Sequence, residues 1–546
     1  MKKIVYILIV LSLSLSGCLN DETTAAHIEI SDLSSEMTDT ILYATTTKPV
    51  ILDATEFITQ TDPNCPLDYV WSVGRIQSWN DYDKFHEVDS MVVISREAKL
   101  NHIFTTIDKR LLLRLQVTNQ YTAHIQYWVV NVTSGFDQGI VLFSKNEEGK
   151  GMFSILNSPK GIDTLLVMKS DDFLYVTGEN DPKLDEDIVD FVFYSGNKGY
   201  PDYNVQIAHI LSKKNKEAYA LDQYSFQTIP HGVFRFSKTP LCLTMHWHTG
   251  NTRELYDLFA FTEDGDVLSY CKKFKGEYSP VAFDTVEHWD RCGFGQSRMS
   301  GDSKQCGDIL WLYNDSTSTI YGMWAHDMQK STSPVASRRL NDYIGPKSFP
   351  GEEIINAAYG LGYRFGMGAP TMNDVFVYTR SKENPRQIYM HTWFSVGWGS
   401  NFINDFQYNN YVRPELAEGE EIALQKDSRI LMLPERNAKY FHNGKKVFSM
   451  TGIAYPPLSS KPHSREVFDA AVATGQPNAE VTDINFYVAK NSNKQYVLIA
   501  LYNPDSDVDK KGSVYVVAAD DLSNIVAKYE NVAYKPLRIF YKYHEL

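Results

Sequence analysis

Short segments in which apolar and polar residues alternate recur along this chain and are separated by turn-forming residues. Between residues 25 and 133, Leu113, Leu115 and Val117 occupy every second position, which places them on one face of a strand. Trp71 lies in an earlier apolar segment of the same stretch. Regular short strands over roughly 100 residues are typical of a β-sandwich, and we expect these side chains to form its core.

After Thr133 the pattern becomes a long series of candidate hairpins. Each has two apolar segments around a turn sequence, and the turns are Glu147-Glu148-Gly149, Glu263 to Asp266, Asp315-Ser316, Glu383-Asn384-Pro385, Asn443-Gly444, Ser492-Asn493 and Asp520-Asp521. Asn443-Gly444 suits a type I′ turn, in which both central residues have positive φ. Hairpins without intervening helices predict a β-propeller-like domain of six to eight blades over residues 134–546. An array of sandwiches is the competing architecture.

Composition supports an all-β chain and narrows the choice of partners. Aromatic residues make up 13% of the chain, which favours strands. The formal charge is −14, and without the two lysines of the N-terminal leader the chain carries 51 basic and 67 acidic residues. Such a surface repels phosphate backbones, so we expect no nucleic-acid partner.

The N-terminus resembles a bacterial lipoprotein leader. Lys2 and Lys3 precede an apolar stretch, Ile4 to Leu15, that ends in Leu15-Ser16-Gly17-Cys18. We expect residues 1–17 to be a signal peptide and Cys18 to carry the lipid, which would be the only membrane anchor. The alternative is an ordinary signal peptide that happens to end in this sequence. Residues 18–24 form the expected tether.

Two resemblances indicate a cellular location and a protein family. Asp21 and Glu22, directly after the lipobox, resemble the acidic surface-export signal of lipoproteins in the Bacteroidetes. The strand Tyr69-Val70-Trp71, the Leu113-x-Leu115-x-Val117 strand and the segment Gly139 to Ser144 resemble the polycystic-kidney-disease-like (PKD-like) lipoproteins of Bacteroidetes nutrient-uptake operons of the starch-utilisation type. The resemblance implies an immunoglobulin-like (PKD-like) domain over residues 25–133 and an outer-membrane location facing the cell exterior. It implies no active-site residue.

Five cysteines remain besides Cys18, so at least one is unpaired within the monomer. Cys292 and Cys306 flank a polar, glycine-containing stretch that we expect to close as a loop. In an oxidising compartment this pair is the disulfide candidate.

Two groups of residues could hold a metal ion, but for each we prefer an interpretation without a metal. His246 and His248 would share a strand face, yet no third ligand has a definite spacing. The acidic run of Asp181, Asp185, Glu186, Asp187 and Asp190 lacks the register of a calcium loop and is expected to be solvated. The adjacent acids Glu147-Glu148 and Glu352-Glu353 are likewise expected in solvated turns. We therefore assign no metal and no cofactor.

A candidate ligand surface lies in the longest irregular stretches. These are residues 178–204, 293–308, 331–372 and 453–480. The segment Gly360 to Gly366 is not a dinucleotide fingerprint, because its last glycine is one residue late and no strand-turn-helix unit frames it. The aromatic and basic residues around it could stack on a sugar or clasp a peptide, and they are Tyr359, Tyr363, Arg364 and Phe365. The alternative is a loop packed into the propeller rim.

The sequence leaves three functions open. The first is a non-enzymatic surface lipoprotein that binds glycan or peptide beside a TonB-dependent transporter and its lid lipoprotein. The second is a surface hydrolase, a glycosidase or peptidase, with rim carboxylates as acid and base, although no Gly-x-Ser-x-Gly or His-Glu-x-x-His motif is present. The third is a structural spacer. We favour the first because no motif positions a nucleophile with its base.

Overall fold

The computed structural model divides the chain into two compact units, residues 1–134 and 135–546. The structure describes residues 32–35, 41–46, 48–76, 90–136, 138–158, 166–197, 204–247, 256–271, 279–280, 289–297, 307–324, 341–362, 372–395, 406–412, 418, 423–426, 428, 430–433, 438–451, 463–488 and 495–542. The all-β class is as expected, since one short α-helix, α3 (Ala470–Thr474), stands among the described strands. No helix in the described ranges is long and apolar enough to cross a membrane.

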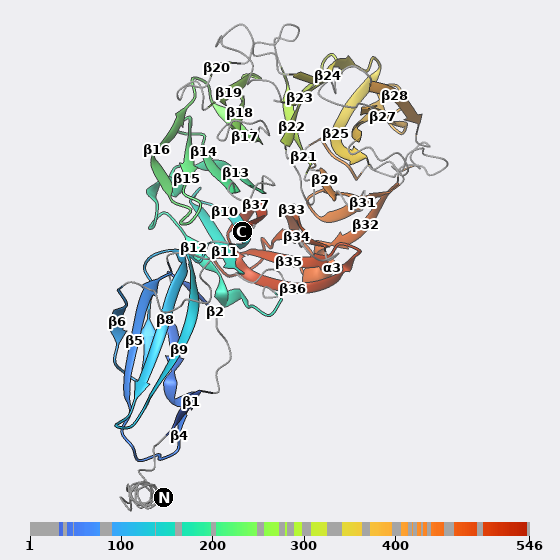
Figure 1. Cartoon of the computed structure of the whole chain (residues 1–546). Coiled ribbons are helices and arrows are strands. Elements are labelled where there is room, and N and C mark those ends of the chain that lie inside the picture. The colour runs from blue at the N-terminus through green and yellow to red at the C-terminus, as the bar shows by residue number, and fades with distance from the viewer. Residues whose placement is uncertain are drawn as a thin grey trace, which may run out of the picture. The chain divides into compact units, whose positions relative to one another are not determined.

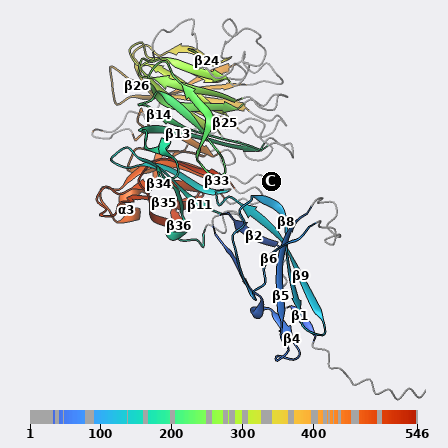
Figure 2. The same ribbon diagram turned by 90° about the vertical axis from the view of Figure 1, so that its left-hand side faces the viewer.

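Unit 1 consists of one larger sheet and two small ones. The five-stranded sheet has the order β2-β9-β8-β5-β6, and β1 pairs with β4 and β3 with β7. Figure 2 shows β5, β8 and β9 side by side. The strands are β1 (Leu33–Ser35), β2 (Ile41–Thr45), β3 (Val50–Asp53), β4 (Ile58–Gln60), β5 (Asp68–Arg75), β6 (Val92–Ser95), β7 (Lys99–His102), β8 (Asp108–Thr118) and β9 (Ala123–Thr133).

The core of unit 1 lies between these sheets. Leu113, Leu115 and Val117 alternate along β8, and all three are fully buried, as their spacing predicts. Trp71 on β5 stacks on Trp128 of β9 with ring centroids 5.8 Å apart. The small sheets contribute apolar residues to the same cluster, so both layers share one core. Two fully buried tryptophans contribute large apolar side chains to this core.

Unit 2 is propeller-like: its described strands form seven successive four-stranded antiparallel groups, which we number I to VII. Figure 1 shows the first strands β13, β21, β29, β33 and β37 toward the middle of unit 2, and β16, β28 and β36 toward its edge.

Group I is β37 (Lys535–Lys542), β10 (Gly139–Lys145), β11 (Gly151–Asn157), β12 (Leu174–Val176); group II is β13 (Ile188–Asn197), β14 (Asn204–Ser212), β15 (Glu217–Leu221), β16 (Thr228–Arg235); group III is β17 (Pro240–Trp247), β18 (Tyr256–Thr262), β19 (Val267–Cys271), β20 (Ser279–Pro280). Group IV is β21 (Arg291–Ser297), β22 (Gly307–Asn314), β23 (Thr319–Trp324), β24 (Asn341–Ser348); group V is β25 (Glu352–Gly362), β26 (Met372–Ser381), β27 (Ile388–Ser395), β28 (Phe406–Val412); group VI is β29 (Ile430–Leu433), β30 (Ala438–His442), β31 (Lys446–Thr451), β32 (His463–Asp469); group VII is β33 (Glu480–Val488), β34 (Gln495–Tyr502), β35 (Gly512–Ala518), β36 (Asp521–Ala533).

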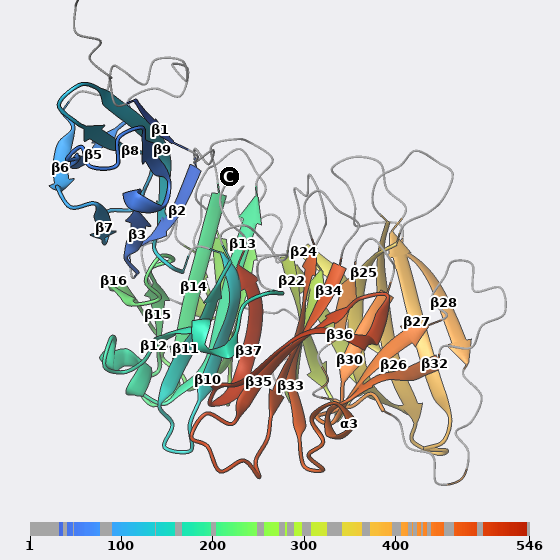
Figure 3. The ribbon, with the colours of Figure 1, turned by 90° about the horizontal axis from the view of Figure 1, so that it is seen from below.

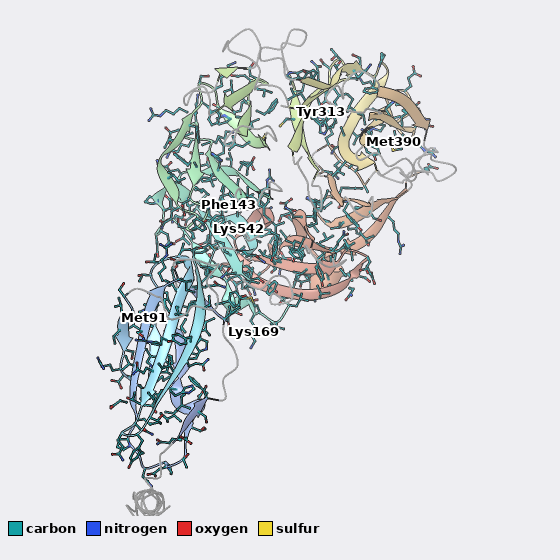
Figure 4. All side chains as sticks on the ribbon, in the orientation of Figure 1. Met91, Phe143, Lys169, Tyr313, Met390 and Lys542 are labelled. Carbon is teal, nitrogen blue, oxygen red and sulfur yellow. The ribbon has the colours of Figure 1, made fainter. Side chains whose placement is uncertain are left out.

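The C-terminal strand completes the first group. β37 pairs antiparallel with β10, from Gly139 opposite Lys542 to Lys145 opposite Lys535. Figure 3 shows β37, in red, beside β10, in cyan. Figure 4 labels Phe143 on β10 and Lys542 on β37. These two paired strands come from opposite ends of the unit 2 sequence. The chain therefore closes group I with its own C-terminal strand, so the two ends of unit 2 meet in one sheet.

Two pairings join strands of different groups directly. His246 of β17 pairs with Gly307 of β22, and Gly295 to Ser297 of β21 pair in parallel with Ile430 to Met432 of β29. Groups III, IV and VI thereby form one continuous twelve-stranded sheet.

Apolar clusters join other neighbours. Groups I and II share a cluster around Phe143, Phe191 and Phe540, while groups VII and I share one around Tyr487 and Tyr541. Further clusters join groups II and III, V and VI, and VI and VII. A sheet with such a cluster on each face is apolar on both sides, which is why β10, β11 and β34 are buried along almost their whole length.

The expectation of long irregular stretches is wrong in large part. Residues 178–204 contain the 3-10 turn η4 (Pro182–Asp185) and β13, and residues 293–308 include most of β21. Residues 331–372 contain β24 and β25, and residues 453–480 contain β32 and α3. Polar residues and glycines conceal these strands from a pattern based on alternation, because backbone pairing within a sheet can form whatever the side chains are.

Most expected hairpins are present. The turns at Glu147, at Glu263 and at Asp315 each join two paired strands. The turn at Asn443-Gly444 also joins two strands, but it is not type I′, because Gly444 has positive φ (85°) and Asn443 does not. Asn443 instead accepts backbone N–H groups from Lys445 and Lys446 through its side chain, as in an Asx turn.

Candidate functional site

Five first strands of unit 2 share a local irregularity near their N-terminal ends. β37, β13, β17, β25 and β33 each carry one extra residue relative to the second strand of their group, which is a β-bulge. The residues directly after the bulges are Arg538, Asp190, Cys242, Asn356 and Asp483, and we call them the junction residues. A bulge re-aims the side chain beside it. Each junction residue has a contact on a neighbouring group.

Asp190 of group II connects three first strands. Its carboxylate accepts hydrogen bonds from the backbone N–H of Leu243 on β17 (2.9 Å) and from the following Phe191 N–H (2.9 Å). It also forms an ion pair with Arg538 of β37, with Nη2 2.9 Å from Oδ1. Asp190 is buried, and Arg538 is largely buried. Burial opposes the charge on Arg538, but the carboxylates of Asp190 and Asp483 outweigh it and raise the pKa of the guanidinium.

Asp483 occupies the same position in group VII. Its Oδ2 accepts the backbone N–H of Ile539 on β37 at 2.9 Å, just as Asp190 accepts Leu243 N–H. Two residues further along β33, the Asn485 side chain donates to the Ile539 carbonyl at 2.7 Å. Both backbone polar groups of Ile539 are therefore satisfied by side chains from the adjacent group. Pairing them in this way removes the cost of burying them between two sheets.

The junction at group V is neutral. Asn356 Nδ2 donates to the carbonyls of Gln425 (3.0 Å) and Ser428 (2.6 Å) in the chain leading to β29. Tyr313 of group IV, labelled in Figure 4, donates to Asn356 Oδ1 at 3.4 Å and accepts Ala357 N–H at 3.1 Å. Burial is the main cause that raises the pKa of Tyr313, so its hydroxyl stays protonated. Arg291 lies over its ring, 3.8 Å from the centroid.

The fifth junction joins two thiols. Cys242 Sγ on β17 lies 3.1 Å from Cys292 Sγ on β21, and both residues are partly exposed. The hydrogen bond with Cys292 and then burial raise the pKa of the Cys242 thiol. Cys306, the expected partner of Cys292, lies outside the described residues, so that pairing stays a prediction. Its premise of a polar loop is wrong for residues 293–297, which belong to β21.

The acidic run around η4 is only in part the solvated loop that its sequence predicts, since Asp185 is exposed but other members are not. Asp181 is buried and accepts Thr228 N–H at 2.6 Å. Glu186 accepts the Tyr219 hydroxyl at 2.5 Å and the Lys183 ammonium at 2.8 Å. Burial raises the pKa of Glu186, but these hydrogen bonds outweigh it, so the net shift is downward. The run therefore fixes the connection between groups I and II.

Glu352 and Glu353 are also not in a solvated turn. They open β25, and Glu352 Oε2 lies 2.8 Å from Nε2 of the buried His391. Thr379 Oγ1 contacts that same Nε2 at 3.1 Å and donates to Glu352. A catalytic triad would instead place the acid on Nδ1 and the hydroxyl on Nε2. Burial opposes ionisation of Glu352, yet the hydrogen bonds from His391 and Thr379 lower its pKa overall.

The other predicted site residues lie mostly where the structure gives no side chain. Cys18, Tyr363, Arg364, Phe365 and His248 are outside the described residues. Tyr359 is on β25, opposite Val375, and His246 is on β17, opposite Asp257 and Gly307. Within the described ranges, no group of three or more His, Cys, Asp or Glu side chains could hold a metal ion.

Sequence reasoning did not identify the junction residues: Asp190 was noted only as part of an acidic run, and Cys242 only as one of the five remaining cysteines. A weak signal exists in two segments nearly 300 positions apart: Ile188-Val189-Asp190-Phe191-Val192-Phe193 and Val481-Thr482-Asp483-Ile484-Asn485-Phe486. Each places one carboxylate among apolar residues near the start of a first strand. Arg538, Cys242 and Asn356 share the position but not the residue type, so no repeat is visible in the letters.

Comparison with known proteins finds structural similarity only. No family model and no curated protein matches the chain. A quinoprotein alcohol dehydrogenase-like protein from Bacteroides thetaiotaomicron is similar over 94% of this chain and 99% of its own, at 10% identity and a TM-score of 0.39. The WD40 domain of Toxoplasma gondii coronin is similar over 74% of this chain and 84% of its own, at 12% identity and a TM-score of 0.32. The propeller-like description of unit 2 follows from its own strand pairings.

Proposed function

We propose that this protein is a lipid-anchored outer-membrane surface protein that binds glycan or peptide without turning it over. In this proposal it works beside a TonB-dependent transporter and its lid lipoprotein. The location rests on the lipobox ending at Cys18 and the acidic residues after it. Unit 2 is a seven-bladed β-propeller and carries the ligand surface.

The observation that carries binding over hydrolysis is the state of the described carboxyl groups. Hydrolysis by two carboxyl groups needs one acid with a raised pKa to protonate the leaving group. Each described Asp or Glu whose pKa clearly departs from its ordinary value has a lowered pKa. For Glu353 of group V, burial is outweighed by hydrogen bonds from Arg380 and Lys426. Such carboxylates accept hydrogen bonds and serve as structural partners.

The ligand surface is proposed at the end of unit 2 opposite the junction residues. Junction residues lie near the N-terminal ends of the first strands, so connections from first to second strands leave from the other end. Tyr363, Arg364 and Phe365 follow the C-terminal end of β25 in one such connection. A rigid sheet that presents loops at one end is a common arrangement for recognition.

We propose that unit 1 is an immunoglobulin-like, PKD-like β-sandwich that serves as a spacer between the lipid and unit 2. Two features support this assignment. The five-stranded sheet packs on smaller sheets through one core, and Trp71 is fully buried in that core.

Two experiments test the proposed function. First, Cys18→Ala should remain unlipidated and leave the cell surface, as measured by fractionation and protease shaving of intact cells. A variant that stays membrane-bound through its own sequence contradicts the anchor. Second, the purified mature protein should bind members of a panel of glycans and peptides and leave them intact, and a native pull-down should recover the transporter complex. Turnover that one carboxylate substitution abolishes would establish the hydrolase instead.

A further inference from the structure

The junction residues follow one geometric rule with different chemistry at each place. After a bulge, each side chain meets a group that matches it: the Asp483 carboxylate meets a backbone N–H, Arg538 meets the Asp190 carboxylate, and Asn356 Nδ2 meets carbonyls. At group III the junction residue is Cys242, and the group it meets is the Cys292 thiol. A thiol pair is the weakest of these contacts while it remains reduced, since S–H is a poor hydrogen-bond donor. Oxidation is the one reaction that would make this junction comparable to the others.

We propose that Cys242 and Cys292 form a disulfide bond that joins the first strands of groups III and IV. The oxidising compartment that it needs rests on the proposed surface location. The sulfurs lie 3.1 Å apart, so modest side-chain rotation brings them to bonding distance. Both residues are partly exposed, which gives an oxidant access to them.

The oxidant is an external disulfide, either that of an exported thiol–disulfide oxidoreductase or oxidised glutathione. One cysteine thiolate attacks a sulfur of the external disulfide, forms a mixed disulfide and expels one thiol. The second cysteine thiolate then attacks the protein sulfur of the mixed disulfide and expels the second thiol. Two cysteine thiols are oxidised to one disulfide, the external disulfide is reduced to two thiols, and the two protons leave on those thiols.

The bond would constrain a large part of unit 2. Cys242 and Cys292 are 50 positions apart, and the three later strands of group III, β18 to β20, lie between them in the sequence. Closing so long a loop reduces the entropy of the unfolded chain. The bond also joins β17 to β21 near the ends where their strands begin, whereas the His246–Gly307 pairing joins the same two groups near the other end of β17.

Peptide mapping distinguishes this bond from the Cys292–Cys306 alternative. Trypsin places Cys242 in Thr239–Arg253 and Cys292 in the short Cys292–Arg298, whereas Cys306 falls in a third peptide that begins at Gln305. We expect a non-reducing digest of the full-length protein from native outer membrane to contain the first two linked. Cys306→Ser is the matched control, and it should leave this link unchanged. Linkage of Cys292 to the Gln305 peptide overturns the proposal.

A second arm separates the pairing from the location. The full chain, purified with its thiols reduced, is treated with oxidised glutathione and digested in the same way. Free thiols at both positions after this treatment overturn the pairing. Linkage in glutathione but not in native membrane supports the pairing and contradicts the proposed surface location instead.

Thermal unfolding supplies a readout beyond mass. Cys242→Ser and Cys292→Ser should each lower the Tm of the oxidised protein by several degrees and by similar amounts. Adding dithiothreitol should lower the Tm of the wild type and of Cys306→Ser but leave the two junction variants unchanged. An equal effect of dithiothreitol on all four proteins would count against the bond.

Discussion

The Asp190 and Asn356 junctions perform the same task in two different ways. Both residues follow a one-residue bulge on the first strand of a group, both are buried, and both bind backbone groups of the next group. Asp190 does so as a charge that needs Arg538, whereas Asn356 does so as a neutral amide that donates to two carbonyls. A repeated backbone feature therefore fixes where the contact forms and leaves open its chemistry.

The difference lies in what happens when one partner is lost. Removing one member of a buried ion pair leaves an uncompensated charge in a poorly solvated site, which costs about 3 to 5 kcal/mol. Removing a neutral hydrogen-bonding side chain leaves unsatisfied dipoles, which costs about 1 to 3 kcal/mol. The charged junction is therefore expected to be more sensitive to substitution, although the two place similar demands on geometry.

The largest effect is expected for Asp190→Ala. This change leaves the Arg538 guanidinium without its ion-pair partner and the Leu243 N–H without its acceptor. We therefore expect the free energy of unfolding to fall by about 3 to 5 kcal/mol. Urea unfolding monitored by tryptophan fluorescence measures it. Glu148→Ala, which removes an exposed ion pair with Lys150, is the control and should be indistinguishable from wild type. Equal midpoints for the two variants would show that the charged junction is not structurally important.

His209 provides a third case, an ionisable group that is kept neutral. It is fully buried on β14, and burial lowers its pKa to about 3. The unfolded chain binds a proton near pH 6.5 and the folded chain does not, so stability is complete above pH 6.5 and decreases as the pH falls toward 3. Between pH 7 and pH 5 we expect a loss on the order of 2 kcal/mol.

His209→Leu is the matched variant for this test, because it keeps an apolar side chain in the same space. Its unfolding free energy should change less than that of wild type over the same pH interval, since the titrating group is gone. Carboxylates contribute below that interval and are common to both proteins. Parallel curves would mean that His209 does not titrate on unfolding as expected.

A change of charge at the neutral junction sharpens the comparison. Asn356→Ala should cost about 1 to 3 kcal/mol. Asn356→Asp should cost more at pH 7, because it turns a carboxylate toward the Gln425 and Ser428 carbonyls, and it should recover as the pH is lowered toward 5. Denaturant midpoints at the two pH values measure this. If Asn356→Asp were as stable as wild type at pH 7, the two junctions would be chemically interchangeable.

The smallest effect on stability is expected away from the junctions. Tyr363→Ala combined with Phe365→Ala should leave the Tm nearly unchanged but weaken ligand binding by about 1 to 3 kcal/mol if these residues are exposed anchors. Titration calorimetry with a ligand identified from the panel measures the affinity. Tyr121→Ala, an exposed aromatic residue of unit 1, is the control and should change neither. A collapse of the Tm in the double variant would place both residues in the core.

Sequence reasoning succeeded where a signal is local. The period-two pattern of Leu113, Leu115 and Val117 predicted their burial, and the turns at Glu147 and Glu263 predicted hairpins that are present. It failed where a polar residue stands in a strand. Glu352 and Asp190 look solvated in the sequence because their partners, His391 and Arg538, are 39 and 348 positions away.

By itself, therefore, the sequence determined the β class, the hairpins with clear turns and the apolar core of unit 1, since each depends on neighbours along the chain. The bulges, the junction contacts, the closure by β37 and the meeting of Cys242 with Cys292 were decided by tertiary structure alone. The junction contacts and the thiol pair join segments from different groups, and the pairing of β37 with β10 joins the two ends of unit 2. Their free energy comes from satisfying buried polar groups across an interface, and that interface exists only once the sheets have packed.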